Sequence, residues 1–290
     1  MNSADMQQQV FAFLADPATH GGAPVKRIDT HAASVFLAGD RALKVKRAVR
    51  FPFLDFSTLA KRKAACEAEI EANRPFAPDL YRGGVAITRA ADGRLAIGGT
   101  GEPVEWAVDM WRFDETQTLD QIAERAGVDL ALADKLARTV AAAHARAPVV
   151  EDAPWIEALA SYIGQNETAF AASEALYRPS EREALTRATF AALRKVRPLL
   201  IIRGRAGLVR RGHGDLHLGN IALIDGEPVP FDALEFDPLV AAGDVLYDLA
   251  FLLMDLVERD LTPAANVVLN RYLAETRRIE DFDGLAALPL

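Results

Sequence analysis

Hydrophobic and polar positions follow two different periods along this chain. Between residues 25 and 110 they alternate as in β-strands, with breaks at turn-forming residues. The segment SVFLAGDRALKVKR predicts two strands joined at Gly39-Asp40, and LYRGGVAITRAADGRLAIGG and PVEWAVDMW predict further strands. Between these strands, TLAKRKAACEAEIEANRPF predicts one helix, with Ser57 as its N-cap and Pro75 beyond its end.

From about Thr116 onward the apolar residues recur at steps of three and four, which is the period of an amphipathic helix. DLALADKLARTVAAAHARAP is the clearest case, and more helices are predicted over 152–177, 180–203, 241–259 and 262–279. We therefore expect an α+β protein with two lobes. A small antiparallel β lobe with one helix would span residues 1–110, and a larger, mainly helical lobe would span residues 111–290.

Composition narrows the functional classes. The chain has 290 residues and a net charge of −8, so it lacks the basic surface that nucleic-acid binding requires. A single cysteine, Cys66, excludes an internal disulfide framework and fits a reducing cytoplasm. The N-terminus has no basic residue before its short apolar run, and no uncharged apolar stretch approaches the ~20 residues of a membrane span. We expect a cytoplasmic protein without a membrane or nucleic-acid partner.

Chemistry-bearing residues are concentrated in VRRGHGDLHLGNIALIDG. His213, Asp215 and Asn220 form the pattern H-x-D-x-x-x-x-N, and the hairpin IALIDGEPVPFD that follows brings Asp232 to the end of an apolar run. Phosphoryl transfer needs one carboxylate to receive the acceptor's proton, and a second carboxylate with an amide oxygen to hold Mg²⁺. The pattern predicts Asp215 as the catalytic base and Asn220 and Asp232 as metal ligands. His213 is expected to fix the loop by hydrogen bonds, and the bland alternative is that these residues only cap a turn.

A kinase site also needs a lysine on a strand and a helix glutamate that holds it. ALKVKR places Lys44 and Lys46 on the same face of a strand, so alternation alone does not separate them. The helix that follows carries Glu67 and Glu69, and the residues leave the choice between these two open as well.

The segments GHGDLHLGNI, PFDALEFDP and GDVLYDLAFLLMDL resemble the aminoglycoside phosphotransferase-like kinases, a group that includes choline and fructosamine kinases and has the protein-kinase fold. Within that group the chain is most similar to bacterial enzymes that are often fused to a P-loop kinase-like domain. The resemblance implies a bilobal kinase-like fold and an ion pair between Lys44 and Glu69. It also implies that Asp109 to Phe113, with Met110 and Trp111 between them, form a hinge that contacts adenine.

The chain departs from the kinase pattern at several points. DTHAASV stands where a glycine-rich loop would lie, which makes Thr30 and Ser34 candidates for phosphate contact. Asp232-Ala233-Leu234-Glu235 replaces Asp-Phe-Gly, and no activation segment or P-loop motif occurs. Because the chain ends on the apolar sequence DGLAALPL, we expect it to be part of a longer protein, with a P-loop kinase-like domain as a possible partner.

Together these features predict an ATP- and Mg²⁺-dependent kinase that phosphorylates a hydroxyl group of a small molecule, with GTP as an alternative donor. A catalytically weak, nucleotide-binding regulatory module is the alternative, and a protein-modifying kinase or nucleotidyl transferase is a third. The resemblance implies that the acceptor binds near residues 150–205. That segment shows no dense cluster of carboxylates for a polycationic aminoglycoside.

Overall fold

The computed structural model describes residues 3–51, 54–173, 176–235 and 241–285. The chain divides into two compact units, the first made of Met1–Thr118 and Ala222–Asp237, the second of Leu119–Ile221 and Pro238–Leu290. The predicted α+β class, with an antiparallel sheet and a mainly helical part, is confirmed. The division differs from the predicted boundary after residue 110, because the segment that carries Asp232 groups with the first unit.

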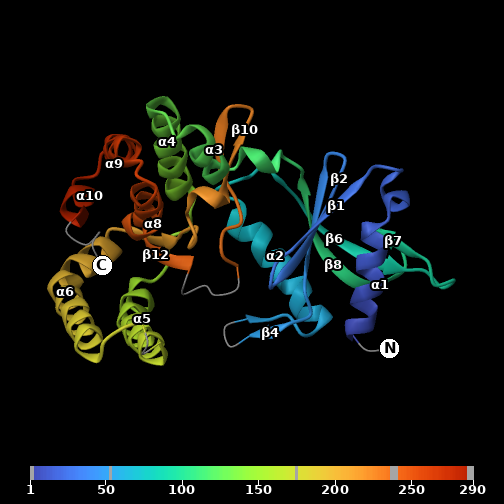
Figure 1. Cartoon of the computed structure of the whole chain (residues 1–290), viewed down its shortest axis with the longest axis horizontal. Coiled ribbons are helices and arrows are strands. Elements are labelled where there is room, and N and C mark those ends of the chain that lie inside the picture. The colour runs from blue at the N-terminus through green and yellow to red at the C-terminus, as the bar shows by residue number, and fades with distance from the viewer. Residues whose placement is uncertain (1–2, 52–53, 174–175, 236–240, 286–290) are drawn as a thin grey trace. The chain divides into compact units, whose positions relative to one another are not determined.

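The first unit is built on an antiparallel sheet with the strand order β1-β2-β3-β8-β6-β7 (Figure 1). The strands are β1 (Val25–Asp29), β2 (Ala33–Ala38), β3 (Arg41–Lys46), β6 (Tyr81–Arg89), β7 (Leu95–Ile97) and β8 (Glu102–Trp111). The predicted hairpin is β2 and β3, and Gly39 turns the chain with a φ of 58°, a left-handed conformation that favours glycine. Two small hairpins complete the strands: β4 (Arg50–Phe51) with β5 (Leu54–Asp55), and β10 (Ile221–Ile224) with β11 (Glu227–Pro230).

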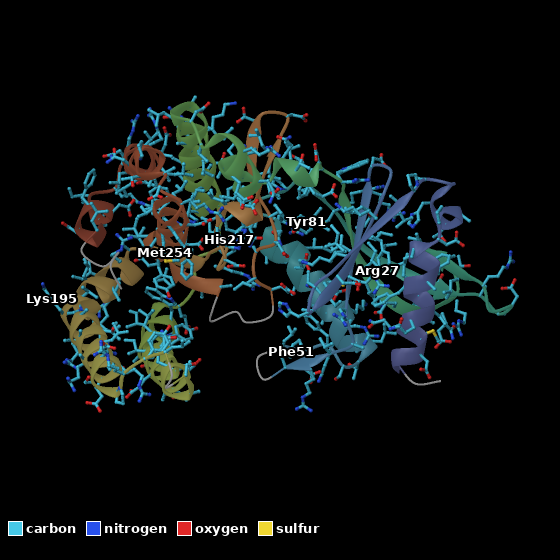
Figure 2. The ribbon with its side chains drawn as sticks, in the orientation of Figure 1. Arg27, Phe51, Tyr81, Lys195, His217 and Met254 are labelled. Carbon is cyan, nitrogen blue, oxygen red and sulfur yellow. The ribbon has the colours of Figure 1, made fainter. Side chains whose placement is uncertain are left out.

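Helix α1 (Ser3–Ala15) packs against this sheet, although the sequence analysis predicted only one helix in this part of the chain. Its buried side chains join a cluster with residues of β2, β3, β6 and β8: Val10, Phe11, Leu14, Phe36, Leu43, Val45, Ile87 and Ala107. Arg27 of β1 lies at the edge of this cluster, 4.8 Å from the ring centre of Phe11 and 5.5 Å from that of Phe36 (Figure 2). The first unit therefore owes part of its core to a segment that the analysis left without structure.

Helix α2 (Leu59–Asn73) is the helix that the sequence predicted, but its N-cap is Thr58 and not Ser57. The Thr58 hydroxyl accepts from the backbone N–H of Lys61, while the Ser57 hydroxyl donates to Asp55. The helix thus begins one residue later than predicted, because Asp55 already binds Ser57. A short 3₁₀ helix, η1 (Pro17–His20), follows α1, and a second, η2 (Glu115–Gln117), follows β8.

The two faces of β3 serve different purposes. Leu43 and Val45 lie in the apolar cluster that α1 completes. Lys44 and Lys46, which alternate with them, contact Glu69 of α2. The period-two alternation of the strand therefore separates packing residues from charged residues.

The second unit is mainly helical. Its elements are α3 (Leu119–Ala126), α4 (Leu130–Arg146), α5 (Asp152–Ala172), α6 (Pro179–Arg205), β9 (Val209–Arg211), η3 (Leu218–Asn220), β12 (Ala242–Asp244), α8 (Val245–Glu258), α9 (Thr262–Thr276) and α10 (Ile279–Gly284). The short strands β9 and β12 pair with each other, so the chain just before the predicted catalytic loop lies beside the start of α8. Within the described ranges, no helix has the length and apolar character needed to cross a membrane.

Arg203 joins three helices of the second unit from a position that is only 1% exposed. Its guanidinium donates two hydrogen bonds to Asp244, of 2.6 and 2.7 Å, and also contacts Asp281 and the carbonyl oxygen of Glu280. The contacts tie the end of α6 to the N-cap of α8 and to α10. A bidentate guanidinium–carboxylate pair of this kind combines charge with fixed geometry.

Arg203→Met is expected to lower the free energy of unfolding by about 3–5 kcal/mol, because it leaves Asp244 buried without its cation. Asp281 would lose one of its two arginine contacts and keep Arg278. Urea unfolding followed by circular dichroism measures the change. Arg205→Met, at an exposed position of the same helix, is the matched control and should change the value by less than about 0.5 kcal/mol. Equal effects of the two substitutions would contradict the assignment.

Candidate active site

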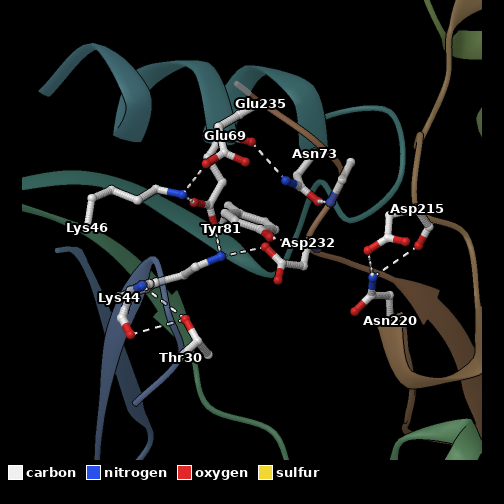
Figure 3. Close-up of polar contacts among 12 residues, drawn as sticks. Thr30, Lys44, Lys46, Glu69, Asn73, Tyr81, Asp215, Asn220, Asp232 and Glu235 are labelled. Atoms are coloured by element: carbon white, nitrogen blue, oxygen red, sulfur yellow. Dashed lines mark hydrogen bonds and ion pairs between the residues drawn. The ribbon is translucent and has the colours of Figure 1, made fainter. Parts of the chain in front are cut away.

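The residues that the sequence singled out fall into two sets, one in each unit. In the first unit, Lys44 lies between two carboxylates: its Nζ is 3.0 Å from Glu69 Oε1 and also donates to Asp232 (Figure 3). Glu69 is fully buried, whereas Glu67 is exposed and faces Lys63 on its own helix. Of the two glutamates that the sequence left open, Glu69 is therefore the one beside the strand lysine.

Lys46 is the second lysine on this face, and it is more deeply buried than Lys44. Its Nζ lies 2.5 Å from Glu69 Oε2 and also donates to Glu235. Lys44 and Lys46 thus share one glutamate, and each takes a further carboxylate from the segment that follows β11. The sequence left the choice between Lys44 and Lys46 open, and in the structure both contact Glu69 while each has one further carboxylate of its own.

These carboxylates determine the charge of both lysines. Burial alone would lower the pKa of Lys44, but the negative charges of Asp232, Glu69 and Glu235 outweigh burial and hold that pKa well above its usual value. For Lys46 the pKa is also raised, since Glu69 and Glu235 outweigh burial and the charge of Lys44. Both ammonium groups are therefore protonated near neutral pH, which gives this face of the sheet two fixed positive charges.

Asp232 is held by its backbone as well as by its carboxylate. Its φ is 62°, an uncommon conformation for a residue other than glycine. Its N–H donates to the Tyr81 hydroxyl at 3.1 Å, and the N–H of Ala233 donates to Asn73 Oδ1 at 3.0 Å. Tyr81 and Asn73 therefore position the aspartate, and the sequence analysis assigned neither of them a role.

Thr30 and Ser34, the two candidates for phosphate contact, both have hydroxyl groups that hydrogen-bond within the protein. Ser34 is fully buried, and its hydroxyl donates to Asp29 at 2.7 Å, which lowers the pKa of that carboxyl. Thr30 closes the turn, because its hydroxyl accepts from the N–H of Ala33 at 3.0 Å. The Ser34 hydroxyl is thus engaged with Asp29, and phosphate contact by Thr30 or Ser34 stays a prediction.

The predicted hinge residues lie at the end of β8. Asp109 and Met110 are paired in register with β3 on one side and β6 on the other, so their backbones belong to the sheet. The Asp109 carboxylate receives two hydrogen bonds of 2.9 Å from Arg41. Trp111 is half exposed, and the Arg82 guanidinium lies 4.4 Å from its ring centre. These contacts are structural, and contact of residues 109–113 with a base stays a prediction.

In the second unit, a buried aspartate of α8 organises the predicted catalytic loop, residues 212–220. Asp248 accepts from the backbone N–H of His213 at 2.8 Å and of Gly214 at 3.0 Å, and its Oδ2 lies 3.0 Å from His144 Nε2. Burial would raise the pKa of Asp248, but the hydrogen bond and charge of His144, with those of His213, outweigh burial and lower it. His213 itself is fully buried, which fits the expected structural role better than contact with a substrate.

Asp215 and Asn220 are the predicted base and metal ligand of this loop. The Asn220 amide nitrogen donates to the Asp215 backbone oxygen at 3.0 Å and to Asp215 Oδ2 at 3.1 Å. The amide therefore turns its carbonyl oxygen away from Asp215 (Figure 3). Gly214, with a φ of 78°, allows the tight turn before Asp215. The fully buried side chains of Leu216 and Leu218 anchor the loop in the core.

His217 lies beside the predicted base, Asp215. Its Nε2 is 3.6 Å from Asp215 Oδ2, and its Nδ1 accepts from the backbone N–H of Gly219. The hydrogen bond and charge of Asp215, helped by Asp255 and Asp120, raise the pKa of His217 against the effect of burial. His217 thus has the predicted base, Asp215, as a neighbour.

Comparison with known proteins identifies the family. The model of the phosphotransferase enzyme family, APH, matches residues 53–287. The match covers well over half of the chain, so the protein belongs to this family. It is also 34% identical over 235 residues to uncharacterised proteins of Mycobacterium tuberculosis and Mycobacterium bovis, which covers 79% of this chain. The chain spans 45% of the length of those relatives.

Two solved structures are similar at low sequence identity. A choline/ethanolamine kinase family protein from Mesorhizobium loti aligns with a TM-score of 0.43 and 14% identity, over 93% of this chain and 76% of the other. The ADP-bound aminoglycoside phosphotransferase APH(2'')-Ib aligns with a TM-score of 0.46 and 11% identity, over 97% and 85%.

Lys46→Met is expected to lower the free energy of unfolding by about 3–5 kcal/mol, because Glu69 and Glu235 would share a buried site without this cation. The matched control is Lys63→Met, which removes an exposed lysine that pairs with exposed Glu67 and should cost less than about 1 kcal/mol. Urea unfolding of the three proteins tests this expectation. A change for Lys46→Met no larger than the control's would show that the buried network contributes little.

His217 is expected to titrate above the ordinary histidine pKa of about 6.5, and Asp215→Asn should bring that pKa down. The raised pKa means that the contact stabilises the loop below the unfolded-state pKa, and that this contribution is lost as pH rises through the folded-state pKa. Histidine ring signals in a pH series of NMR spectra measure it, with exposed His31 of the first unit as internal reference. An identical titration of His217 in both proteins would rule out the coupling to Asp215.

Proposed function

We propose that this phosphotransferase moves the γ-phosphoryl group of ATP to a hydroxyl group of a small molecule, with Mg²⁺ as cofactor. The observation that carries the proposal is the contact of one strand lysine, Lys44, with both a buried helix glutamate and Asp232. Membership of the phosphotransferase family supports the reaction class. The loop pair Asp215 and Asn220 supports a hydroxyl acceptor, because a carboxylate held by an amide N–H is a suitable group to receive a hydroxyl proton.

The nucleotide phosphates are assigned to Lys44. Its side chain is 13% exposed and stays charged, so it offers an ammonium group that Glu69 holds in one direction. An ammonium group held by a buried carboxylate is well suited to the α- and β-phosphates. The proposal takes ATP as donor, and GTP uses the same phosphate contacts.

The residues present fit a magnesium ion. Three carboxylates, those of Glu69, Asp232 and Glu235, face two lysines, which leaves one net negative charge. The Asp232 side chain is 42% exposed, and the Asn220 amide is oriented by Asp215. No group of three or more His, Cys, Asp or Glu suited to a metal occurs among the described residues. Mg²⁺ commonly takes one or two protein oxygens and completes its shell with phosphates and water, so the Asp232 carboxylate and the Asn220 amide oxygen would be its protein ligands. When bound, the ion neutralises charge on the phosphates.

The transfer step follows from these roles. The acceptor's hydroxyl oxygen forms a bond to the γ-phosphorus while the bond from that phosphorus to the β–γ bridging oxygen breaks. Asp215 receives the hydroxyl proton, and ADP leaves with the bridging oxygen. Asn220 keeps the Asp215 carboxylate in place through its amide N–H, and Asp248 fixes the backbone of the loop. A positioned base of this kind contributes about 10²–10⁴-fold to the rate.

Wild type, Asp232→Asn and Asp215→Asn separate the roles. MgATP should raise the Tm of the wild type, because a ligand that binds only the folded state stabilises it. Asp232→Asn should lose most of that shift, since it removes the proposed metal ligand. Asp215→Asn should keep the shift but release ADP about 10²–10⁴-fold more slowly, since it removes the base. Thermal denaturation and an ADP-release assay supply the two readouts.

Asp225→Asn, at an exposed turn of the β10–β11 hairpin, is the matched control and should leave both readouts unchanged. A wild type that binds MgATP without releasing ADP, with every candidate acceptor tried, would favour the regulatory module over the enzyme. A wild type whose Tm does not respond to any nucleotide would contradict the proposal.

A further inference from the structure

The second unit contains a cavity of about 190 Å³ next to the catalytic loop. Four aromatic side chains line it: Trp155 and Tyr162 of α5 and Tyr247 and Phe251 of α8. Gly212 and Gly214 of the catalytic loop complete its wall, and Gly214 directly precedes Asp215. The cavity therefore opens onto the backbone of the residue that precedes the proposed base.

Three of the four aromatic side chains are joined by ring contacts. Trp155 and Tyr247 meet edge to face, with ring centres 5.8 Å apart, and Tyr247 and Phe251 do the same at 5.4 Å. The lining glycines pack closely against neighbouring side chains: a Cβ on Gly243 would lie 3.2 Å from Trp155 Nε1, and one on Gly212 would lie 2.9 Å from Asp248 Oδ2. Substitution at either glycine would disturb the wall.

Among the described residues that line the cavity, one side chain is charged, and it already has hydrogen-bond partners. Asp248 is the one carboxylate among its described lining residues, which include no lysine or arginine. The Asp248 oxygens already accept from the N–H groups of His213 and Gly214 and lie against His144. A polycationic aminosugar would find neither several free carboxylates nor a polar wall here.

We propose that this cavity binds the acceptor, and that the acceptor is a compact, uncharged alcohol with one apolar or aromatic ring. The inference rests on the proposed function and names its substrate class. A dry protein cavity of about 150 Å³ holds a benzene molecule, so this volume suits a single ring with a short hydroxyl-bearing arm. The arm would extend past Gly214 to Asp215, where its oxygen bonds to the γ-phosphorus and its proton passes to the Asp215 carboxylate.

Benzyl alcohol is the probe, with choline as a singly charged and streptomycin as a polycationic comparator. Saturation-transfer NMR on the whole chain measures binding of each compound. Benzyl alcohol should bind the wild type, and Tyr247→Leu and Phe251→Leu should each weaken it about three- to tenfold, because each removes one aromatic contact of the wall. Phe170→Leu, on α5 but outside the cavity, is the matched control and should leave binding unchanged.

Circular dichroism and the MgADP-induced Tm shift are measured on the same samples, so that loss of folding is recognised and nucleotide binding is followed independently. Two wall variants are used so that one that fails to fold leaves the other to decide. Weakening in a folded wall variant, with an unchanged MgADP shift, supports the cavity as the acceptor site. Tighter binding of choline or streptomycin, or equal binding of benzyl alcohol to folded wall variants, would overturn the substrate class.

The two proposals fail in different ways. If MgADP shifts the Tm and benzyl alcohol does not bind the cavity, the proposed phosphotransferase function stands and the substrate class is wrong. If benzyl alcohol binds the cavity but no nucleotide shifts the Tm, the acceptor role falls together with the proposed function.

Discussion

One buried carboxylate, Glu69, is the centre on which the first unit's chemistry depends. It lies fully buried on α2 and faces two lysines of the same strand. Burying an ion costs free energy unless a partner of opposite charge lies close with good geometry. Glu69 is therefore stable in its buried position only with the two lysines beside it. Lys44 and Lys46 then extend the network to Asp232 and Glu235. A single helix residue thus fixes the lysine face of the sheet and the segment after β11.

In the second unit, the buried groups that need partners are backbone N–H groups and not charged side chains. In the predicted catalytic loop, the backbone N–H groups of His213 and Gly214 have no helix or strand partner. Buried N–H groups need hydrogen-bond acceptors. Asp248 supplies them, and His144, itself bonded to Tyr272, holds Asp248 in turn. The loop is therefore rigid where it presents Asp215, although it has little regular structure. These hydrogen bonds hold the loop that carries Asp215, as the proposed role of Asp215 as a preorganised base requires.

Much of the fold could be predicted because its signals are local. The β2–β3 hairpin follows from alternation and a Gly-Asp turn, and the long helices follow from their apolar period. Helix α1 lies in the N-terminal segment, whose short apolar run was weighed only as a targeting or membrane signal and not for a helical period. Asp232 and Ala233 contact Tyr81 and Asn73 across about 150 residues of sequence, and a single sequence carries no signal for such long-range contacts. The N-cap of α2 moved by one residue because Asp55 competes for Ser57.

The candidate site was predictable to a similar degree. Motif spacing placed Asp215, Asn220 and Asp232, and strand alternation placed Lys44 and Lys46 on one face. Which lysine meets which carboxylate depends on three-dimensional packing and was not available from the pattern. Tyr81 and Asn73 were missed for the same reason, because a tyrosine at a strand start and an asparagine at a helix end carry no distinctive signal. Ser34 was a candidate for phosphate contact from its hydroxyl alone, and that hydroxyl is buried and donates to Asp29.

A crystal structure with a non-hydrolysable ATP analogue and Mg²⁺ tests the central claim most directly. The account predicts phosphate oxygens within hydrogen-bond distance of Lys44 Nζ, a Glu69 carboxylate still on that lysine, and Mg²⁺ on the carboxylate of Asp232. An analogue bound away from Lys44, with Lys44 still paired to Asp232 and no metal on that aspartate, would contradict it.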